Sequence, residues 1–215
     1  FVKYERFYEG DLFKKHQNNE LSFVAKKTME PITGIIYGKY ENIGIAINGK
    51  ANGIFTIYNN DDRYFEKSNY SNGKLDGLSK VWNSRSKKIL IKEANYKNGR
   101  LNGALKEWSY RGQLLKDENY INDLLNGSYR KYYGDKVEVI GNYLNGEKIG
   151  SWSVLHLKKN KEITLNFKNG LFESGENLNE VGFYFTRSKF FKPDNIPYER
   201  LTRIALDENI TLSKL

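Results

Sequence analysis

Apolar and polar residues alternate along short segments of this chain, and the segments end at turn-forming pairs. From Gly103 to Trp108 the sequence reads Gly-Ala-Leu-Lys-Glu-Trp, a run of alternating character that ends shortly before Arg111-Gly112. A period of two is typical of a β-strand with one face in the core. Asn-Gly pairs separate such segments, and they favour tight turns because both residues tolerate positive φ. The pattern therefore predicts a series of β-hairpins.

The turns recur at a nearly constant spacing. The first turn-glycine position falls at residues 49, 73, 99, 123, 146 and 170, with an aspartate at 123, so the intervals are 24, 26, 24, 23 and 24 residues. A second glycine follows four residues later in five copies, and an aromatic residue comes five residues after it in four of them. Self-similarity at a fixed period predicts a repeat protein. The repeat positions are Gly49, Gly53, Tyr58, Tyr70, Gly73, Gly77, Trp82, Tyr96, Gly99, Gly103, Trp108, Tyr120, Gly127, Tyr132, Tyr143, Gly146 and Gly150.

One hairpin of this size is not stable alone in water, so neighbouring hairpins must pack side by side. Equivalent residues of adjacent units would then lie about 9.5 Å apart, and the tyrosines and tryptophans would form columns along one face. We expect these columns to be the core. Trp108→Ala should then cost about 3–5 kcal/mol, as for other buried aromatic residues. The second glycine of each unit predicts a bend or a close approach of two backbones.

The motif Tyr-x-Asn-Gly-x-x-x-Gly-x-x-x-x-(Trp/Tyr) resembles the MORN repeat, in the bacterial variant of YwqK-type antitoxins. The resemblance covers about residues 34–172. It implies an elongated, twisted single sheet of antiparallel hairpins. It also implies an interaction role, such as scaffolding, dimerisation or peripheral membrane contact, and the antitoxin label implies a toxin as partner. Two positions depart from the motif, Asp123 at a turn glycine and Leu155 at the aromatic position.

The chain divides into three parts by this pattern. Residues 1–33 form an N-terminal cap or degenerate repeat, residues 34–175 form the hairpin repeats, and residues 176–215 form a C-terminal cap. In the last part a strand is expected at Val181–Phe185 and a short helix after Pro197, since proline is favoured at the first turn of a helix. The predicted fold is all-β, an elongated antiparallel single-sheet repeat of MORN-like β-hairpins with a short C-terminal helical cap.

The net charge of +9 lies in the middle of the chain, where residues 66–170 carry 20 basic and 11 acidic side chains. Such an excess attracts acidic partners at long range or serves as a solubilising surface. The densest basic clusters supply the candidate anion-binding residues. These are Arg130, Lys131, Lys158, Lys159 and Lys161. An anionic lipid surface is compatible with them, whereas nucleic acid is disfavoured because the repeat assigns the neighbouring Tyr132 to a core column.

The sequence offers little catalytic chemistry. It has no cysteine, and its two histidines, His16 and His156, are far apart in the chain. No nucleotide-binding, zinc-protease, nucleophile-elbow or calcium-loop motif is present. The adjacent carboxylates Asp61 and Asp62 are typical of a solvated turn. We therefore expect no enzyme activity, no catalytic residue, no cofactor and no metal site.

The preferred function is a non-enzymatic scaffold for protein–protein interaction with an unidentified partner, or with a second copy through edge strands. The alternative is electrostatic binding to an anionic membrane or nucleic acid through the basic block. The sequence contains no run of 18 apolar residues, so it predicts no membrane-spanning helix. Because the chain begins at Phe1, it is compatible with removal of a signal peptide, and a cell-envelope or secreted location is slightly favoured over the cytoplasm.

Overall fold

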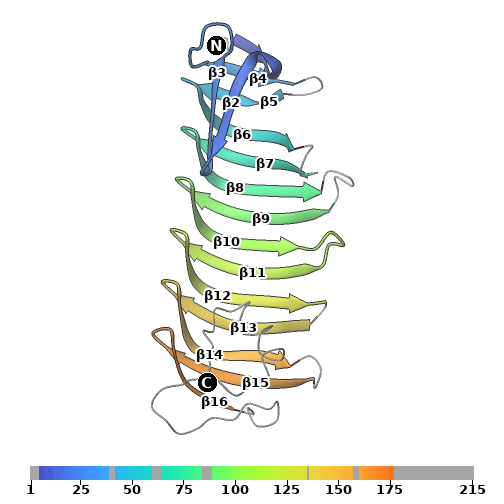
Figure 1. Ribbon diagram of the computed structural model, residues 1–215, viewed down its shortest axis with the longest axis vertical. Coiled ribbons are helices and arrows are strands. Elements are labelled where there is room, and N and C mark those ends of the chain that lie inside the picture. The colour runs from blue at the N-terminus through green and yellow to red at the C-terminus, as the bar shows by residue number, and fades with distance from the viewer. Residues whose placement is uncertain are drawn as a thin grey trace, which may run out of the picture.

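The protein is an all-β sheet of consecutive hairpins stacked along one axis (Figure 1). The computed structural model describes residues 5–38, 42–59, 64–83, 89–134, 136–156 and 160–176. Within these ranges sixteen strands belong to one sheet, and all pairings are antiparallel except that of β1 with β4. The predicted all-β sheet of antiparallel hairpins is confirmed. The strand and helix expected within residues 176–215 lie outside the described residues.

The first four strands have four to six residues, and most repeat strands have eight to ten. The first four are β1 (Glu5–Tyr8), β2 (Leu12–Gln17), β3 (Glu20–Ala25) and β4 (Gly34–Tyr37), with a 3-10 turn at Glu9–Asp11. The repeat strands are β5 (Asn42–Ile47), β6 (Lys50–Asn59), β7 (Tyr64–Ser71), β8 (Lys74–Asn83), β9 (Leu90–Lys97), β10 (Arg100–Trp108), β11 (Leu114–Ile121), β12 (Leu124–Tyr133), β13 (Lys136–Leu144), β14 (Glu147–His156), β15 (Lys161–Lys168) and β16 (Leu171–Glu176). No described helix is long and apolar enough to cross a membrane.

The two-residue turns of the repeat form one long edge of the sheet. Both turn residues have positive φ, for example 51° at Asn98 and 81° at Gly99, as hairpin turns that match the strand twist require. The Gly99 N–H donates to the Leu75 carbonyl of the preceding unit at 2.7 Å, and Gly146 donates likewise to Leu125 at 2.8 Å. We call this row the turn edge, and it comprises residues 48–49, 72–73, 98–99, 122–123, 145–146 and 169–170.

The second glycine of the repeat lies in a bulge in four of the strands that follow the turns, β8, β10, β12 and β14. Leu101 pairs with Tyr96 and Leu105 pairs with Ala94, so residues 102–104 are opposite a single residue of β9. Gly103 has a φ of 113°, and a Cβ there would lie 3.1 Å from Cβ of Asn95. At this bulge the two backbones approach closely, as expected from the sequence. Glycine fits because it tolerates the positive φ and has no Cβ to crowd Asn95.

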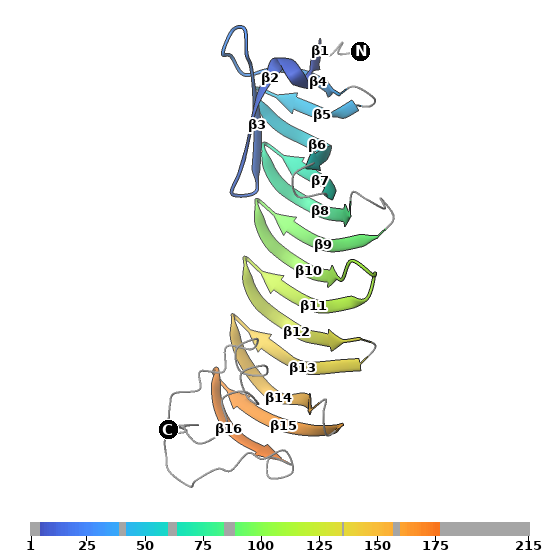
Figure 2. The same cartoon turned by 45° about the vertical axis from the view of Figure 1, so that its right-hand side comes forward.

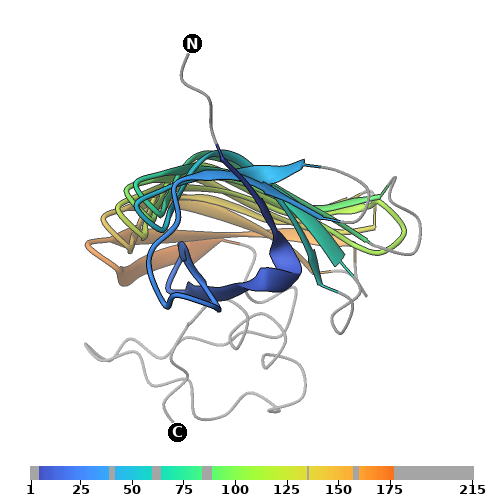
Figure 3. The ribbon, with the colours of Figure 1, turned by 90° about the horizontal axis from the view of Figure 1, so that it is seen from above.

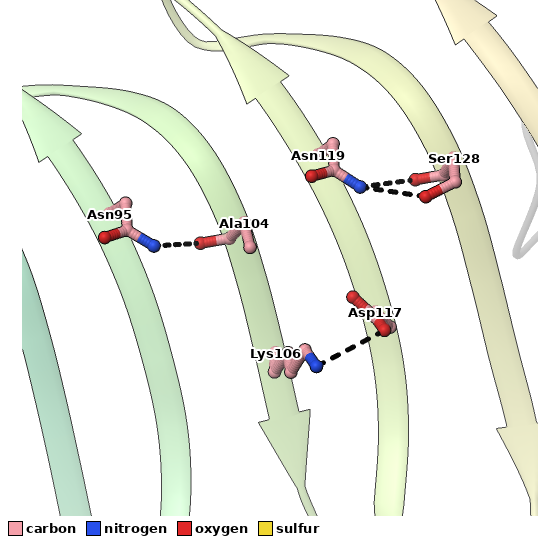
Figure 4. A network of polar contacts seen from close by, with 6 residues as sticks. All are labelled: Asn95, Ala104, Lys106, Asp117, Asn119 and Ser128. Atoms are coloured by element: carbon pink, nitrogen blue, oxygen red, sulfur yellow. Dashed lines mark hydrogen bonds and ion pairs between the residues drawn. The ribbon is translucent and has the colours of Figure 1, made fainter.

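Side-chain amides complete the bulges on the face that carries Asn95 (Figure 4). The Asn95 side chain donates to the Ala104 carbonyl at 3.3 Å. In the next unit Asn119 donates to the carbonyl and the hydroxyl of Ser128 at 3.2 and 2.9 Å. These bonds satisfy backbone carbonyls that the bulge removes from the regular ladder. The asparagine at the start of each motif therefore has a structural role.

The hairpin of β2 and β3 leaves the order of the repeats and crosses the concave side of the arched sheet (Figures 2 and 3). Its strand β3 runs along the turn edge, where the Phe23 N–H donates to the Gly49 carbonyl at 2.6 Å and Leu21 N–H to the Gly73 carbonyl at 2.7 Å. The Leu21 and Phe23 side chains are buried against the concave face, and the ring of Phe23 stacks on Phe55 at 5.6 Å. The hairpin thereby seals the first part of the sheet.

The described core is divided into two clusters on this concave face. The first contains β3, β6 and β7 residues around Phe55, and the second is centred on Trp152. Each large ring has a glycine beside it. A Cβ at Gly44 would lie 2.6 Å from the Phe55 ring, and a Cβ at Gly141 would lie 2.1 Å from the Trp152 ring. Each glycine therefore makes room for the main side chain of its cluster.

Candidate protein-interaction face on the concave side

At the turns 72–73, 98–99 and 122–123, two repeat positions line the concave face beside the turn edge, the tyrosine before the turn and the leucine after it. At the next turn the second position is held by Lys148. In the second unit, Tyr70 and Leu75 are only 2% and 4% exposed, because the β2–β3 hairpin covers this part of the sheet. The next two units have no such described cover, and their equivalent side chains are half-buried. We call these residues the open strip: Tyr96, Leu101, Tyr120 and Leu125.

The open strip lies between the two core clusters. Tyr96 packs against the first cluster and Leu125 against the second. Between them Tyr120 pairs with Leu125, and Tyr96 pairs with Leu101, so all four side chains lie on the same face. The four residues thus form a row of half-buried apolar side chains between the two clusters. Such a surface gains stability when another chain removes it from water.

Charged groups next to the open strip are paired with one another. The Tyr120 hydroxyl donates to the Glu118 carboxylate at 2.8 Å, and the Lys116 ammonium lies 3.7 Å from the other oxygen of this carboxylate. Burial and the hydrogen bond to Glu118 raise the pKa of Tyr120, so its hydroxyl stays protonated. Further along, Lys131 and Glu138 form an ion pair of 3.9 Å. These pairs leave little local charge to attract an ionic ligand.

The other repeat aromatics lie on the convex face, which corrects an expectation from the sequence. Trp82 pairs with Phe65, and their rings stack at 4.8 Å, whereas the adjacent Glu66 is buried on the concave face. Trp108 and Tyr132 are each three positions after a buried concave residue, so they also lie on the convex face and are half-buried. Tyr58 is 44% exposed. The prediction that tyrosines and tryptophans share one face is wrong.

The candidate anion-binding residues do not form one cluster among the described residues. Arg130 and Lys131 are neighbours in β12, so their side chains point to opposite faces. Lys131 is paired with Glu138, as described above. Lys161 begins β15 and is exposed, while Lys158 and Lys159 lie outside the described residues. The basic residues that are close together in the sequence are therefore not gathered on one face of the described structure.

A polar group under the hairpin links β2 to the sheet. The His16 Nε2 atom lies 3.3 Å from the Tyr70 hydroxyl, and the two rings meet edge to face. Beneath them the Ser68 hydroxyl is hydrogen-bonded to the Glu66 carboxylate and lies 2.6 Å from Ser79 Oγ. Burial raises the pKa of Tyr70, and the nearby Glu66 charge adds to this shift. The group therefore connects the hairpin to strands β7 and β8 of the sheet.

His16 makes the attachment of the hairpin depend on pH. Burial lowers the pKa of His16 below its usual 6.5, and Lys14 adds to this while Glu66 opposes it. The unfolded chain therefore binds the proton more readily, so stability is full above about pH 6.5 and falls as pH decreases through that value. We expect the wild-type thermal midpoint to drop more than that of His16→Gln between about pH 7.5 and about pH 5.5. Equal drops in the two proteins would contradict this attachment.

The described residues contain no group of three or more histidine, aspartate or glutamate side chains that could hold a metal ion. Asp61 and Asp62 lie outside these residues, as does the side chain of His156.

Sequence reasoning missed the buried Trp152, because the motif aligned Leu155 with the aromatic position. Trp152 is two residues after the second glycine of its unit, a position that Phe55 and Tyr129 occupy in other units. All three are buried.

Comparison with models of known protein families and with curated proteins gives no match. The structure by itself shows a long sheet of consecutive antiparallel hairpins, consistent with a β-hairpin repeat. The functional conclusion therefore depends on the surface of this chain, and above all on the open strip.

Proposed function

We propose that this chain is a non-enzymatic repeat scaffold that binds another protein on its concave face, along the open strip. One observation carries the proposal. Leu75, Leu101 and Leu125 occupy the same position in three successive units, yet among the residues that the structure describes only Leu75 is covered by a strand from elsewhere in the chain. The other two carry the same apolar side chain without a described strand over it. A row of half-open apolar side chains on one face is the kind of surface that a protein partner buries.

The resemblance to MORN repeats leads to a finer form of this proposal. The Tyr-x-Asn-Gly motif, its spacing of about 24 residues and the stack of hairpins support a bacterial MORN variant related to YwqK-type proteins. In that form the partner would be a toxin that the concave face holds inactive. Only the motif supports the antitoxin role, whereas the open strip supports protein binding of any kind.

Two neighbouring leucines provide the test. Leu125 belongs to the open strip, and Leu124 is exposed on the opposite face of the same strand. We expect Leu125→Glu to weaken capture of the natural partner from an extract of the source organism by at least about tenfold, because a charge would be buried against apolar groups. Leu124→Glu, which adds the same charge, should capture as the wild type does. Equal capture by both variants would contradict binding along the open strip.

The alternative function, binding to an anionic surface, is favoured by one hollow of the structure. A pocket of about 370 Å³ lies where the hairpin tip meets the turn edge, and Lys15, Lys50 and Lys74 line it. Glu20 lies 3.4 Å from the Lys74 ammonium and offsets part of this charge. If this function dominates, binding falls steeply from about 50 to about 200 mM salt. Binding along the open strip should change little over that range.

A further inference from the structure

Strand β3 shows how the concave side of this sheet accepts an extended chain. Every second residue of the segment bonds to a successive turn: Phe23 N–H to the Gly49 carbonyl, Leu21 N–H to the Gly73 carbonyl, and the Asn19 side-chain amide to the Gly99 carbonyl at 3.0 Å. The side chains of Leu21 and Phe23 cover the adjacent concave face. The mode of binding is thus a row of backbone hydrogen bonds on one side and alternating apolar side chains on the other.

The carbonyls of the turn edge are available because of the turn geometry. In each unit the N–H at the glycine position donates to the preceding unit, as Gly99 does to Leu75 at 2.7 Å and position 123 does to Leu101 at 3.0 Å. The carbonyl of the same residue takes no part in the pairing of the two strands that the turn connects. It therefore remains for a chain that runs along the edge, which is how β3 uses it.

Three further turns repeat this geometry beyond the end of β3. Asp123, Gly146 and Gly170 have φ values of 70°, 86° and 74°, close to the 75°, 84° and 81° of the three turns that β3 and Asn19 cover. Among the described residues, no backbone hydrogen bond ends on the carbonyls of these three turns. The Asp123 turn lies beside Tyr120 and Leu125 of the open strip. Beside the Gly146 and Gly170 turns the same face carries Tyr143, Lys148 and Phe167, which are buried in or against the second cluster. The acceptor row therefore continues from the open strip along the second cluster.

We propose that an extended segment of a partner protein adds to this part of the turn edge in the manner of β3. Backbone N–H groups of alternate partner residues bond to the carbonyls of Asp123, Gly146 and Gly170. The residue at Asp123 places an apolar side chain over Tyr120 and Leu125 of the open strip, and the next two place theirs along the adjoining second cluster. The segment needs alternating apolar residues rather than charge, because Lys116 and Lys131 beside the strip are already paired with carboxylates. This inference rests on the proposed function and specifies the partner as a β-strand.

The chain supplies a probe of suitable chemistry, the peptide of residues 18–27, which contains β3. Three fluorescent versions are titrated with the full chain and followed by anisotropy: unmodified, N-methylated at Leu21 and Phe23, and N-methylated at Ser22 and Val24. The unmodified and Ser22/Val24-methylated peptides should bind alike, because those N–H groups point away from the turns. Methylation at Leu21 and Phe23 should weaken binding at least about tenfold, since two hydrogen bonds are lost.

The binding place is tested with the two leucine variants. Leu125→Glu should remove peptide binding, and Leu124→Glu should leave it unchanged, with circular dichroism showing that both variants fold. Binding that survives Leu125→Glu places the peptide elsewhere, for instance in place of β3, and overturns the inference. Lack of binding by the unmodified peptide, or an equal effect of both methylation patterns, also overturns it, while partner capture that depends on Leu125 would leave the proposed function standing.

A second copy of the chain is the other occupant to distinguish. Sedimentation of the full chain without peptide should show a monomer. A dimer that Leu125→Glu dissociates would mean that the open strip binds another copy, and the assignment to a separate partner would be wrong.

Discussion

Replacing Trp152 with alanine is expected to lower the free energy of unfolding by about 3–5 kcal/mol. The indole is 1% exposed, and its ring lies 5.0 Å from Tyr143, 5.5 Å from Tyr129 and 6.1 Å from Phe167. The Lys148 ammonium lies 4.5 Å above it and adds a cation–π contact. Alanine would remove all these contacts and leave a cavity in the second cluster. Urea unfolding followed by circular dichroism measures the change.

Trp108→Ala is the matched control for this prediction. Its side chain is half-buried on the convex face, so the expected loss is about 1 kcal/mol rather than the 3–5 kcal/mol that the sequence alone suggested. Because neighbouring units carry most of the stability in a repeat protein, the Trp152 variant should unfold first in its C-terminal half. A loss at Trp108 as large as that at Trp152 would contradict the assignment of the two faces.

Gly141→Leu is expected to destabilise the same cluster at least as much as the loss of Trp152. A Cβ at this position would lie 2.1 Å from the indole Cδ2 atom and 2.3 Å from Cε2, distances that no packed structure allows. The indole would have to leave its site, so its contacts would be lost and strain would be added. The same unfolding measurement applies, with an expected loss of more than about 3 kcal/mol.

A double-mutant comparison separates this mechanism from a backbone effect. In the Trp152→Ala background the ring is absent, so adding Gly141→Ala should cost much less than adding it to the wild type. The two substitutions are therefore expected to be strongly non-additive. Additive losses would show that Gly141 is needed for its backbone rather than for the space beneath the ring.

The sequence predicts the hairpin repeat well because its signals are local. An Asn-Gly pair determines a tight turn within two residues, and the glycine four positions later allows a bulge beside an asparagine such as Asn95.

The wrong prediction of one aromatic face could have been avoided by counting residue positions from the turn. Leu101 pairs with Tyr96, and Trp108 is seven positions after Leu101, an odd number that puts it on the other face.

The β2–β3 hairpin is the part that sequence reasoning could not place. Its strands alternate only weakly, and its contacts join residues far apart in the chain, as when Leu21 bonds to Gly73 or Asn19 to Gly99. No local pattern contains information about a turn that is 52 or 80 residues away. The open strip follows from the same contacts, because it is defined by where the hairpin ends. The candidate site therefore needed the structure.

The ladder of turn hydrogen bonds has a consequence for how this molecule can change in length. Each turn bonds to the unit before it, as Gly73 does to Ala51 and Gly170 does to Lys148, so no unit in the middle is unique. Duplication of a whole unit would recreate the bonds on both sides, and the two core clusters of the described residues lie toward the two ends of the stack. Gain or loss of a whole unit would therefore change the length of the sheet along its stacking axis in steps of two strands, about 9.5 Å each.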